Sequence, residues 1–381
     1  MNDLLSESPK MMLYAWNGYK KEAWGCQEVN TDTGSCHNPP ILGTKSLGAS
    51  IIDAMDTLFL MGLDKEVEEG KKFVEHLDFD IDTEASLFEI NIRFIGGLLS
   101  MYTFTADKIY LDKAEDLAKK LLPAFETKTG FPKSLINLRT KYAHMHSWST
   151  GGCAILAEFG SLIMEWNYLS ELTQNPIYSN KMIKIYESIK TLETLNNGVY
   201  YNFYNAETGS PCSKSASFGG LGDSFYEYLI KEHFRTNGHF TLGRELYDKA
   251  IDGLLTSGMY STSERSQSNF IASYDYGSTS KSMEHLTCFA GGMLMLGAKG
   301  SMEDVNFQRG LNITSTCRKS YESSAIGLGP EKFFFTHELD AVSNIKSGKM
   351  YILRPELVES YFYAYRFTKD EKYRKWAWDV V

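Results

Sequence analysis

The fold of this chain is decided by an apolar stretch with two adjacent glycines, residues 90–101, which reads INIRFIGGLLSM. Apolar or small side chains cover most faces of a helix with this sequence, and a helix without a polar face is buried. A second stretch of the same kind, residues 286–296, reads LTCFAGGMLML. By contrast, residues 108–121 and 181–192 carry one apolar stripe opposite a face of lysine and glutamate. Buried helices and half-exposed helices therefore alternate along the chain.

Helical periodicity covers most of the chain, and alternation with period two is confined to short segments such as residues 198–203 and 350–353. Glycine, proline and asparagine separate thirteen predicted helices, at residues 12–24, 47–62, 64–77, 85–105, 107–121, 152–173, 177–193, 219–235, 240–257, 283–298, 302–321, 354–368 and from 370 onward. The simplest closed arrangement of such alternating helices is an all-α fold, an α/α barrel of helical hairpins. Thirteen helices leave the last hairpin incomplete at the C-terminus.

No linker or low-complexity tract interrupts the chain, so we expect one barrel domain over residues 12–381, after an N-terminal extension at residues 1–11. The net charge of −9, without a basic stripe, argues against a nucleic-acid partner. No stretch reaches the roughly 18 apolar residues that cross a bilayer, so we expect no transmembrane segment. His285 and Cys288 could form half of a metal site, but no second pair accompanies them.

Three carboxylates lie near the N-termini of predicted buried helices, beside glycine, proline or aromatic residues: Glu89, Asp223 and Glu356. In a barrel of hairpins the buried helices run in the same direction. Their N-termini meet at one rim, so the three carboxylates are expected to converge on one cavity. A helix N-terminus also favours the ionised form of a carboxylate, as a general base requires.

Each of these carboxylates also has a purely structural interpretation. Glu89 and Arg93 are spaced i, i+4 and could form an ordinary helix ion pair. Asp223 could be the N-cap after a flexible glycine loop. Glu356 follows Pro355 and could simply interact with the dipole of the first helical turn.

Taken in order, several blocks of the chain resemble glycoside hydrolase family 47, the class I α-mannosidases. The blocks lie at residues 15–19, 52–58, 88–99, 121–125, 219–229, 288–293 and 351–361. The resemblance implies an (α/α)7 barrel and an inverting, calcium-dependent exo-α-1,2-mannosidase, a hydrolase that trims high-mannose N-linked glycans on glycoproteins.

Carried over by position, Glu89 matches the general acid, and Asp223 and Glu356 match the other two catalytic carboxylates, with the base most often assigned to the position of Glu356. Sugar-contacting or pocket-shaping positions match Arg93, Arg354 and Pro355, and a pocket histidine matches His285. The resemblance also implies a disulfide bond between Cys288 and Cys317. The remaining cysteines are left as unassigned thiols: Cys26, Cys36, Cys153 and Cys212.

Residues 219–226, GGLGDSFY, resemble the Golgi subgroup, because the endoplasmic reticulum enzyme carries an arginine near the position of Leu221. The resemblance therefore implies the lumen of the secretory pathway, and the Golgi apparatus rather than the endoplasmic reticulum. The sequon at Asn312, followed by Ile313 and Thr314, is expected to be exposed and open to glycosylation.

The chain departs from the family at Glu22 and Gln27, near the entrance helix, and the family's C-terminal region with its calcium-binding threonine has no counterpart. We therefore expect no metal ligand in this chain, an open barrel seam with exposed apolar side chains at residues 51–60 and 376–380, and weak hydrolysis of α-1,2-mannobiose even with calcium. The same hydrolysis assay on a chain extended to the family's C-terminus would provide the comparison.

Three alternatives remain open. The first is a non-catalytic glycan-binding protein of the degradation-enhancing mannosidase-like type, which needs the sugar pocket but no acid and base. The second is an inactive fragment of a mannosidase. The third is an unrelated inverting α/α-barrel glucanase, which would explain the helices and acids but not the ordered blocks.

Overall fold

Helices dominate the computed structural model, which describes residues 2–381, with side chains described from residue 7 onward. Each of the thirteen predicted segments contains an observed helix. The chain divides into two compact units, which are described separately. The first consists of Met1–Ala154, Leu162–Lys190 and Ala206–Thr208, and the second of Ile155–Ser161, Thr191–Asn205 and Gly209–Val381.

The first unit contains most of the N-terminal helices and five short strands in two small sheets. Its helices are α1 (Asn2–Ala23), α2 (Ala49–Leu60), α3 (Asp64–His76), α4 (Leu87–Glu89), the π-helix η2 (Ile90–Ile95), α5 (Gly96–Thr105), α6 (Lys108–Leu121), α8 (Ile163–Thr173) and α9 (Ile177–Ile189), with 3-10 turns η1 (Pro40–Leu42) and η3 (Leu122–Phe125). Its strands are β1 (Glu28–Asn30), β2 (Ser35–His37), β3 (Glu84–Ser86), β4 (Leu135–Asn137) and β5 (Ala143–His144). The strand β6 (Ala154–Ile155) lies where the two units meet in the sequence.

The second unit contains the remaining helices and small sheets. Its helices are α7 (Leu156–Gly160), α10 (Asp223–Arg235), α11 (Thr241–Thr256), α12 (Ala290–Gly297), α13 (Val305–Glu322), α14 (Glu356–Thr368) and α15 (Lys372–Val380), with 3-10 turns η4 (Leu286–Phe289) and η5 (Ser347–Lys349). Its strands are β7 (Thr194–Leu195), β8 (Val199–Tyr200), β9 (Phe203–Tyr204), β10 (Ser215–Ala216), β11 (Tyr260–Thr262), β12 (Asn269–Ile271), β13 (Tyr274–Asp275), β14 (Ser278–Thr279), β15 (Ser282–Glu284), β16 (Lys332–Phe335) and β17 (Asp340–Val342).

The strands form small antiparallel sheets that precede or connect helices. In the first unit the order is β3-β4-β5, with Ser86 opposite Leu135. In the second unit the orders are β10-β13-β14 and β15-β16-β17, with Met283 opposite Phe333. Both β3 and β15 end directly before a helical segment that carries candidate site residues.

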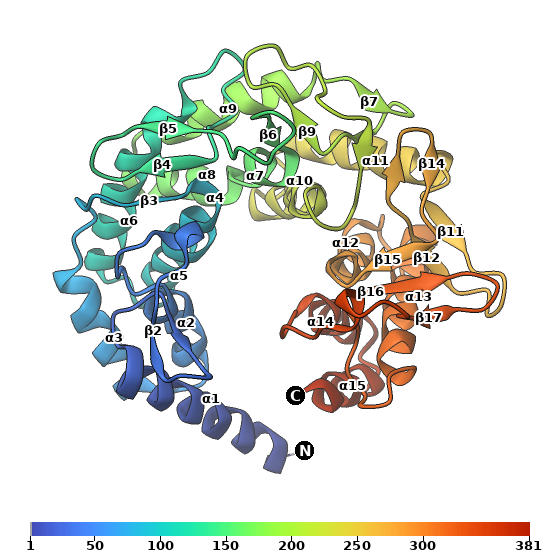
Figure 1. Cartoon of the computed structure of the whole chain (residues 1–381), viewed down its shortest axis with the longest axis horizontal. Helices are drawn as coiled ribbons and strands as arrows, with labels where there is room; N and C mark the ends of the chain where they lie inside the picture. Colours follow the sequence, from blue (N-terminus) through green and yellow to red (C-terminus); the bar gives the residue numbers. More distant parts are fainter. Residues whose placement is uncertain (1) are drawn as a thin grey trace. The chain divides into compact units, whose positions relative to one another are not determined.

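Consecutive helices pack in pairs, as the alternation of burial predicts. The pairs are α2 with α3, α5 with α6 and α8 with α9 in the first unit, and α10 with α11, α12 with α13 and α14 with α15 in the second. The first members also contact one another, since α5 packs on α2 and α8, and α12 packs on α10 and α14. Figure 1 shows α12 and α13 side by side, and the buried residues of α12 extend over nearly its whole length.

Two predicted helices are interrupted by other structure. Residues 85–105 begin as β3, pass through α4 and the π-helix η2, and become regular only in α5. Residues 283–298 likewise begin as β15 and a 3-10 turn before α12. In both segments strand pairing takes up the first backbone groups, so the helix starts later than side-chain periodicity alone indicates.

Other boundaries differ in the same local way. Helix α1 begins at Asn2 rather than at residue 12, and the predicted helix 152–173 is divided into α7 and α8 by Ser161 and Leu162. Helix α13 begins at Val305, because the carboxylate of Asp304 accepts hydrogen bonds from the backbone N–H groups of Asn306 and Phe307. The division into an extension and a barrel domain stays a prediction.

Disulfide bonds link nearby segments within each unit. Cys288 and Cys317 are joined by an S–S bond of 2.06 Å, which confirms the implied pairing. The assignment of the remaining cysteines as free thiols is wrong, since no cysteine of the described chain is free. Cys26 bonds to Cys36, because the β1-β2 hairpin returns the chain and brings their Cα atoms to 5.6 Å.

Apolar side chains were expected to be exposed at residues 51–60 and 376–380, and only some of them are. Leu60 is 71% exposed. Trp376, however, is half-buried: its ring packs against Tyr361 and Tyr373, and the guanidinium of Arg318 lies 5.5 Å from the ring centroid. Aromatic and cation–π contacts therefore cover a side chain that the sequence left without a partner.

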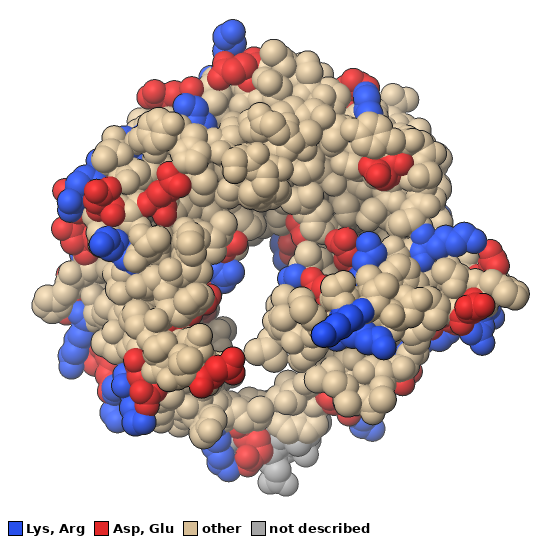
Figure 2. All heavy atoms as spheres, in the orientation of Figure 1, with Lys and Arg blue, Asp and Glu red and all other residues tan. Residues whose placement is uncertain are grey.

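Figure 2 shows one face of the molecule, coloured by charge. On the face shown in Figure 2, acidic and basic side chains are interspersed. This fits the absence of a basic stripe in the sequence. Within residues 2–381, no helix combines the length and apolarity needed to cross a bilayer.

The close contact of α12 with its neighbours leads to a stability prediction. A Cβ atom at Gly291 would lie 2.3 Å from Oγ1 of Thr314 and 2.8 Å from Oγ of Ser360, whereas one at Gly18 in α1 would meet nothing within 4 Å. We expect Gly291→Ala to lower the free energy of unfolding by about 1–3 kcal/mol through overpacking. Gly18→Ala, the matched control, is expected to raise it by up to about 1 kcal/mol through helix propensity. Urea unfolding measures both, and equal effects would contradict the close packing.

Candidate active site

Glu89 lies at the end of α4, where the chain leaves strand β3 and enters the π-helix. The hydroxyl of Ser86 accepts a hydrogen bond from the backbone N–H of Glu89 at 3.3 Å and caps this turn. The carboxylate of Glu89 pairs with Nε of Arg93 at 2.8 Å, and Nη1 of Arg93 pairs with the carboxylate of Asp53 in α2 at 2.9 Å. Glu89 and Arg93 thus form the expected i, i+4 pair, but a third residue shares it. π-Helical turns are frequent at functional sites.

Asp223 opens α10 directly after the glycine loop. Its side chain keeps some solvent-accessible surface but is surrounded by protein on most sides. This desolvation raises the pKa of Asp223 to about 7, and the nearby carboxylates of Glu227, Glu356 and Glu284 add to the shift. A hydrogen bond from the backbone N–H of Ser224 at 2.9 Å opposes it. Asp223 can therefore exchange a proton near neutral pH.

A lysine partly neutralises this group of carboxylates. The Lys231 ammonium pairs with Glu227 one helical turn away and with Glu359 of α14 at 2.9 Å. Burial raises the pKa of Glu359 to about 7, with a further contribution from Glu227, while Lys231 opposes the shift. Burial disfavours the charge of Lys231, but the two carboxylates outweigh this effect and raise its pKa.

Glu356 occupies the first turn of α14 and contacts a buried histidine. Its Oε2 lies 3.1 Å from Nδ1 of His285, whose side chain is 2% exposed. The other ring nitrogen, Nε2, lies 2.7 Å from the hydroxyl of Tyr321 in α13. Pro355 stands directly before the helix and supplies no N–H at its start.

Arg354 forms a two-point ion pair with the carboxylate of Glu331. The hydrogen bonds to Glu331 raise the pKa of Arg354, and the charges of Glu356 and Asp223 contribute as well. The positive charge of Arg354 therefore acts on the carboxylates of Glu356 and Asp223. Such an arrangement of shifted pKa values is typical of a functional site.

The second unit brings together four of the predicted site residues, Asp223, His285, Arg354 and Glu356, with Pro355 at the helix start. The first unit holds Glu89 and Arg93 together. The convergence of Glu89 with the two other carboxylates stays a prediction.

Sequence reasoning missed several residues that surround the candidates, namely Asp53, Glu227, Lys231, Glu284, Tyr321, Glu331 and Glu359. A signal for some of them existed. Asp223, Glu227 and Lys231 follow at spacings of four, which places them on one helix face. Glu331 and Tyr321 had no such signal, because only tertiary packing brings them to Arg354 and His285.

The suggested metal pair of His285 and Cys288 is not available for metal binding, since Cys288 is part of a disulfide bond. In residues 2–381, as far as they are described, no group of three or more His, Cys, Asp or Glu side chains could hold a metal ion.

The sequence model of glycosyl hydrolase family 47 matches residues 11–381. The chain belongs to this family. It is similar to mannosyl-oligosaccharide 1,2-alpha-mannosidase IB of Homo sapiens, with 41% identity over 387 residues, covering all of this chain and 60% of that protein. A mannosyl-oligosaccharide alpha-1,2-mannosidase IA of Drosophila melanogaster is also 41% identical, over 98% of this chain and 56% of its own length.

Among solved structures, an alpha-1,2-mannosidase from Trichoderma reesei is similar to the whole chain and to 84% of that structure, with a TM-score of 0.88 and 28% identity. This likeness confirms the predicted fold class, the all-α class of (α/α)7 barrels. This family 47 chain spans 60% or less of the length of the two curated relatives named above.

The raised pKa of Asp223 makes a prediction about stability and pH. Because its folded-state pKa of about 7 lies above its ordinary value of 3.8, its contribution to stability is fully present below pH 3.8 and is lost as the pH rises through 7. Asp223→Asn removes this penalty. We expect the variant to be more stable than the parent at pH 8, by at most about 4 kcal/mol at 1.36 kcal/mol per pKa unit, and equally stable near pH 4.

Urea unfolding between pH 4 and pH 8 measures this difference. Asp252→Asn, at an exposed aspartate of the adjacent helix α11, is the matched control and should show no such pH dependence. A stability difference for Asp223→Asn that is the same at every pH would contradict the buried-acid interpretation.

Proposed function

We propose that this protein is an inverting exo-α-1,2-mannosidase that removes mannose from high-mannose N-linked glycans. The observation that carries the proposal is the pairing of Glu356 with a buried histidine beside Asp223, an acid with a pKa near neutrality, in a chain of family 47. The named relatives, which are mannosyl-oligosaccharide mannosidases, support the substrate class.

In the proposed reaction, Glu356 or Asp223 removes a proton from a water molecule as its oxygen bonds to the anomeric carbon. The bond from that carbon to the leaving oxygen breaks at the same time, and Glu89 supplies the proton that the leaving oxygen takes up. Attack from the face opposite the leaving group inverts the anomeric configuration. The mechanism requires roughly 6.5–9.5 Å between the acid and the base to admit the water.

Substrate contacts are proposed for the basic and buried residues near these acids. Arg93 and Arg354 are each fixed by a carboxylate, Glu89 and Glu331 respectively, so their guanidinium groups are oriented before a sugar binds. The non-catalytic alternative needs a sugar pocket but no titrating acid. The cluster around Asp223, which costs stability at neutral pH, therefore favours catalysis.

The calcium ion that the family resemblance implies is also a proposal. When bound, such an ion would coordinate the hydroxyl oxygens of the sugar. Among the described side chains, no group of three or more His, Cys, Asp or Glu could hold a metal ion. For this reason, no step of the proposed mechanism depends on the ion.

The proposal predicts the loss of turnover on removal of single carboxyl groups. With α-1,2-mannobiose as substrate, Glu89→Gln and Glu356→Gln should each lower kcat about 10²–10⁴-fold, because each removes one proton-transfer group. Glu68→Gln, at an exposed glutamate of α3, is the control and should leave kcat unchanged. Proton NMR of the first product identifies the anomer.

β-Mannose as the first product is expected for inversion. If α-mannose forms first, or if the unsubstituted chain shows no turnover with or without added calcium, this mechanism is wrong for the chain.

We also propose a location in the lumen of the secretory pathway, in the Golgi apparatus rather than the endoplasmic reticulum. Its support is the glycan-processing activity named for the relatives, and disulfide bonds such as Cys288–Cys317 that form in oxidising compartments.

Asn312 provides a test of the location in the secretory lumen. Its side chain is exposed in α13 and donates to the side chain of Asn269 at 3.1 Å, while the hydroxyl of Thr314 is buried and donates to the carbonyl of Gly310. We expect the secreted protein to carry an N-glycan at Asn312, attached before α13 folds. Mass spectrometry before and after glycosidase treatment should show the loss of a glycan. Asn312→Gln should abolish it and Asn306→Gln in the same helix should not. An unmodified secreted protein would contradict the prediction.

A further inference from the structure

Tyr321 lies outside the predicted site and contacts its buried histidine directly. It lies in α13, its side chain is 1% exposed, and its hydroxyl lies 2.7 Å from Nε2 of His285. The ring of His285 is therefore held at both nitrogens, by Tyr321 at Nε2 and by Glu356 at Nδ1.

The direction of these two hydrogen bonds follows from the groups involved. An ionised carboxylate can only accept hydrogen bonds, and a neutral imidazole donates from one nitrogen and accepts at the other. Glu356 lies in the first turn of α14, and its Oε2 is 3.1 Å from Nδ1 of His285. With the Glu356 carboxylate as acceptor, a neutral His285 carries its proton on Nδ1, and Nε2 accepts a hydrogen bond from the tyrosine hydroxyl.

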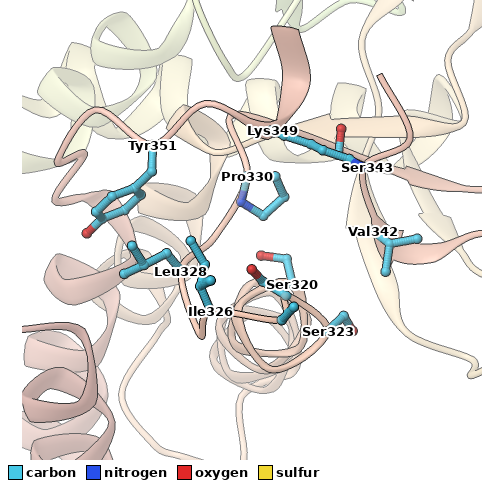
Figure 3. Close-up of a pocket in the computed structure, with 11 residues that line it drawn as sticks. Ser320, Ser323, Ile326, Leu328, Pro330, Val342, Ser343, Lys349 and Tyr351 are labelled. Atoms are coloured by element: carbon cyan, nitrogen blue, oxygen red, sulfur yellow. The ribbon is translucent and has the colours of Figure 1, made fainter. Parts of the chain in front are cut away.

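The surroundings of Tyr321 keep its hydroxyl protonated and shielded from water. Burial raises its pKa well above the usual range, and the adjacent tyrosine, Tyr351, adds to the shift. The ring of Tyr351 packs edge-on against that of Tyr321, with the centroids 6.4 Å apart. Tyr351 also forms part of the wall of a pocket of about 330 Å³, together with Ser320 and Pro330 (Figure 3). Tyr351 therefore contacts both this pocket and the ring of Tyr321.

We propose that Tyr321 is a positioning residue for Glu356: its hydroxyl donates to Nε2 of His285, keeps the imidazole proton on Nδ1, and so holds the Glu356 carboxylate in one orientation. Without this donor, the imidazole can carry its proton on Nε2 instead, and Glu356 then loses a hydrogen bond. The catalytic role of Glu356 rests on the proposed function, but the tautomer of His285 does not.

The tautomer can be measured without turnover. We expect ¹⁵N NMR of the whole chain, labelled at histidine, to show a protonated Nδ1 and an unprotonated Nε2 for one residue, assigned to His285 by its loss in His285→Gln. Tyr321→Phe should move the proton at least partly to Nε2. Tyr247→Phe is the matched control, because it removes another buried hydroxyl, which donates to the carbonyl of Met293 at 3.2 Å. It should leave the His285 signals unchanged.

A protonated Nε2 in the unsubstituted chain, or unchanged His285 signals in Tyr321→Phe, would overturn the proposal. If Tyr321→Phe does not fold, the measurement on the unsubstituted chain still decides the matter.

The kinetic consequence is tested separately. With α-1,2-mannobiose, Tyr321→Phe should lower kcat about tenfold and leave KM within about twofold, because orientation of the base matters in the transition state and not in sugar binding. Tyr247→Phe should leave both within about twofold. An unchanged kcat in Tyr321→Phe would overturn the positioning role. If the NMR signals show the expected tautomer but neither the parent chain nor any variant turns over substrate, the proposed function fails. The hydrogen-bond assignment then still stands.

Discussion

The geometry around Glu356 depends on two hydrogen bonds of the Ser360 hydroxyl. This hydroxyl donates to the carbonyl of Cys288 at 2.6 Å and accepts from the backbone N–H of Gly292 at 2.8 Å, and thereby joins α14 to the start of α12. The approach is possible because residues 291 and 292 have no side chains to separate the two helices. Glu356 lies one turn before Ser360, and His285 lies three residues before Cys288. The contact that fixes the two helices therefore also places the carboxylate against the imidazole.

The group of carboxylates in the second unit is stabilised only in part. Burial raises the pKa values of Asp223 and Glu359 to about 7, which means that their ionised forms lack full compensation in the folded protein. Lys231 pairs with Glu359 but is shared with Glu227, and Arg354 is engaged by Glu331. A structure selected for stability alone would replace such groups. Under the proposed function, the burial of Asp223 serves proton transfer, which needs a group whose pKa lies near the working pH.

Residues 90–101 and 286–296 show how much of the fold can be predicted from the sequence. Their all-round apolarity predicted burial, and the structure confirms it for α5 and α12. The strand and irregular helical turns before each of them could not be predicted, since Ser86 and Met283 form strands only because Leu135 and Phe333 pair with them from elsewhere in the chain. The candidate acids were found from their places at helix starts. Glu331 and Tyr321 were not, because their contacts with Arg354 and His285 depend on packing and not on spacing.

The glycine loop before Asp223 has a specific structural role. In the structure, the backbone N–H of Gly220 donates to the carboxylate of Glu284 at 3.1 Å, and a Cβ atom at Gly219 would lie 2.7 Å from the same oxygen. The glycines therefore allow a carboxylate to approach the backbone. Since the charge of Glu284 helps to raise the pKa of Asp223, the loop contributes to the acid that follows it as well as to the start of the helix.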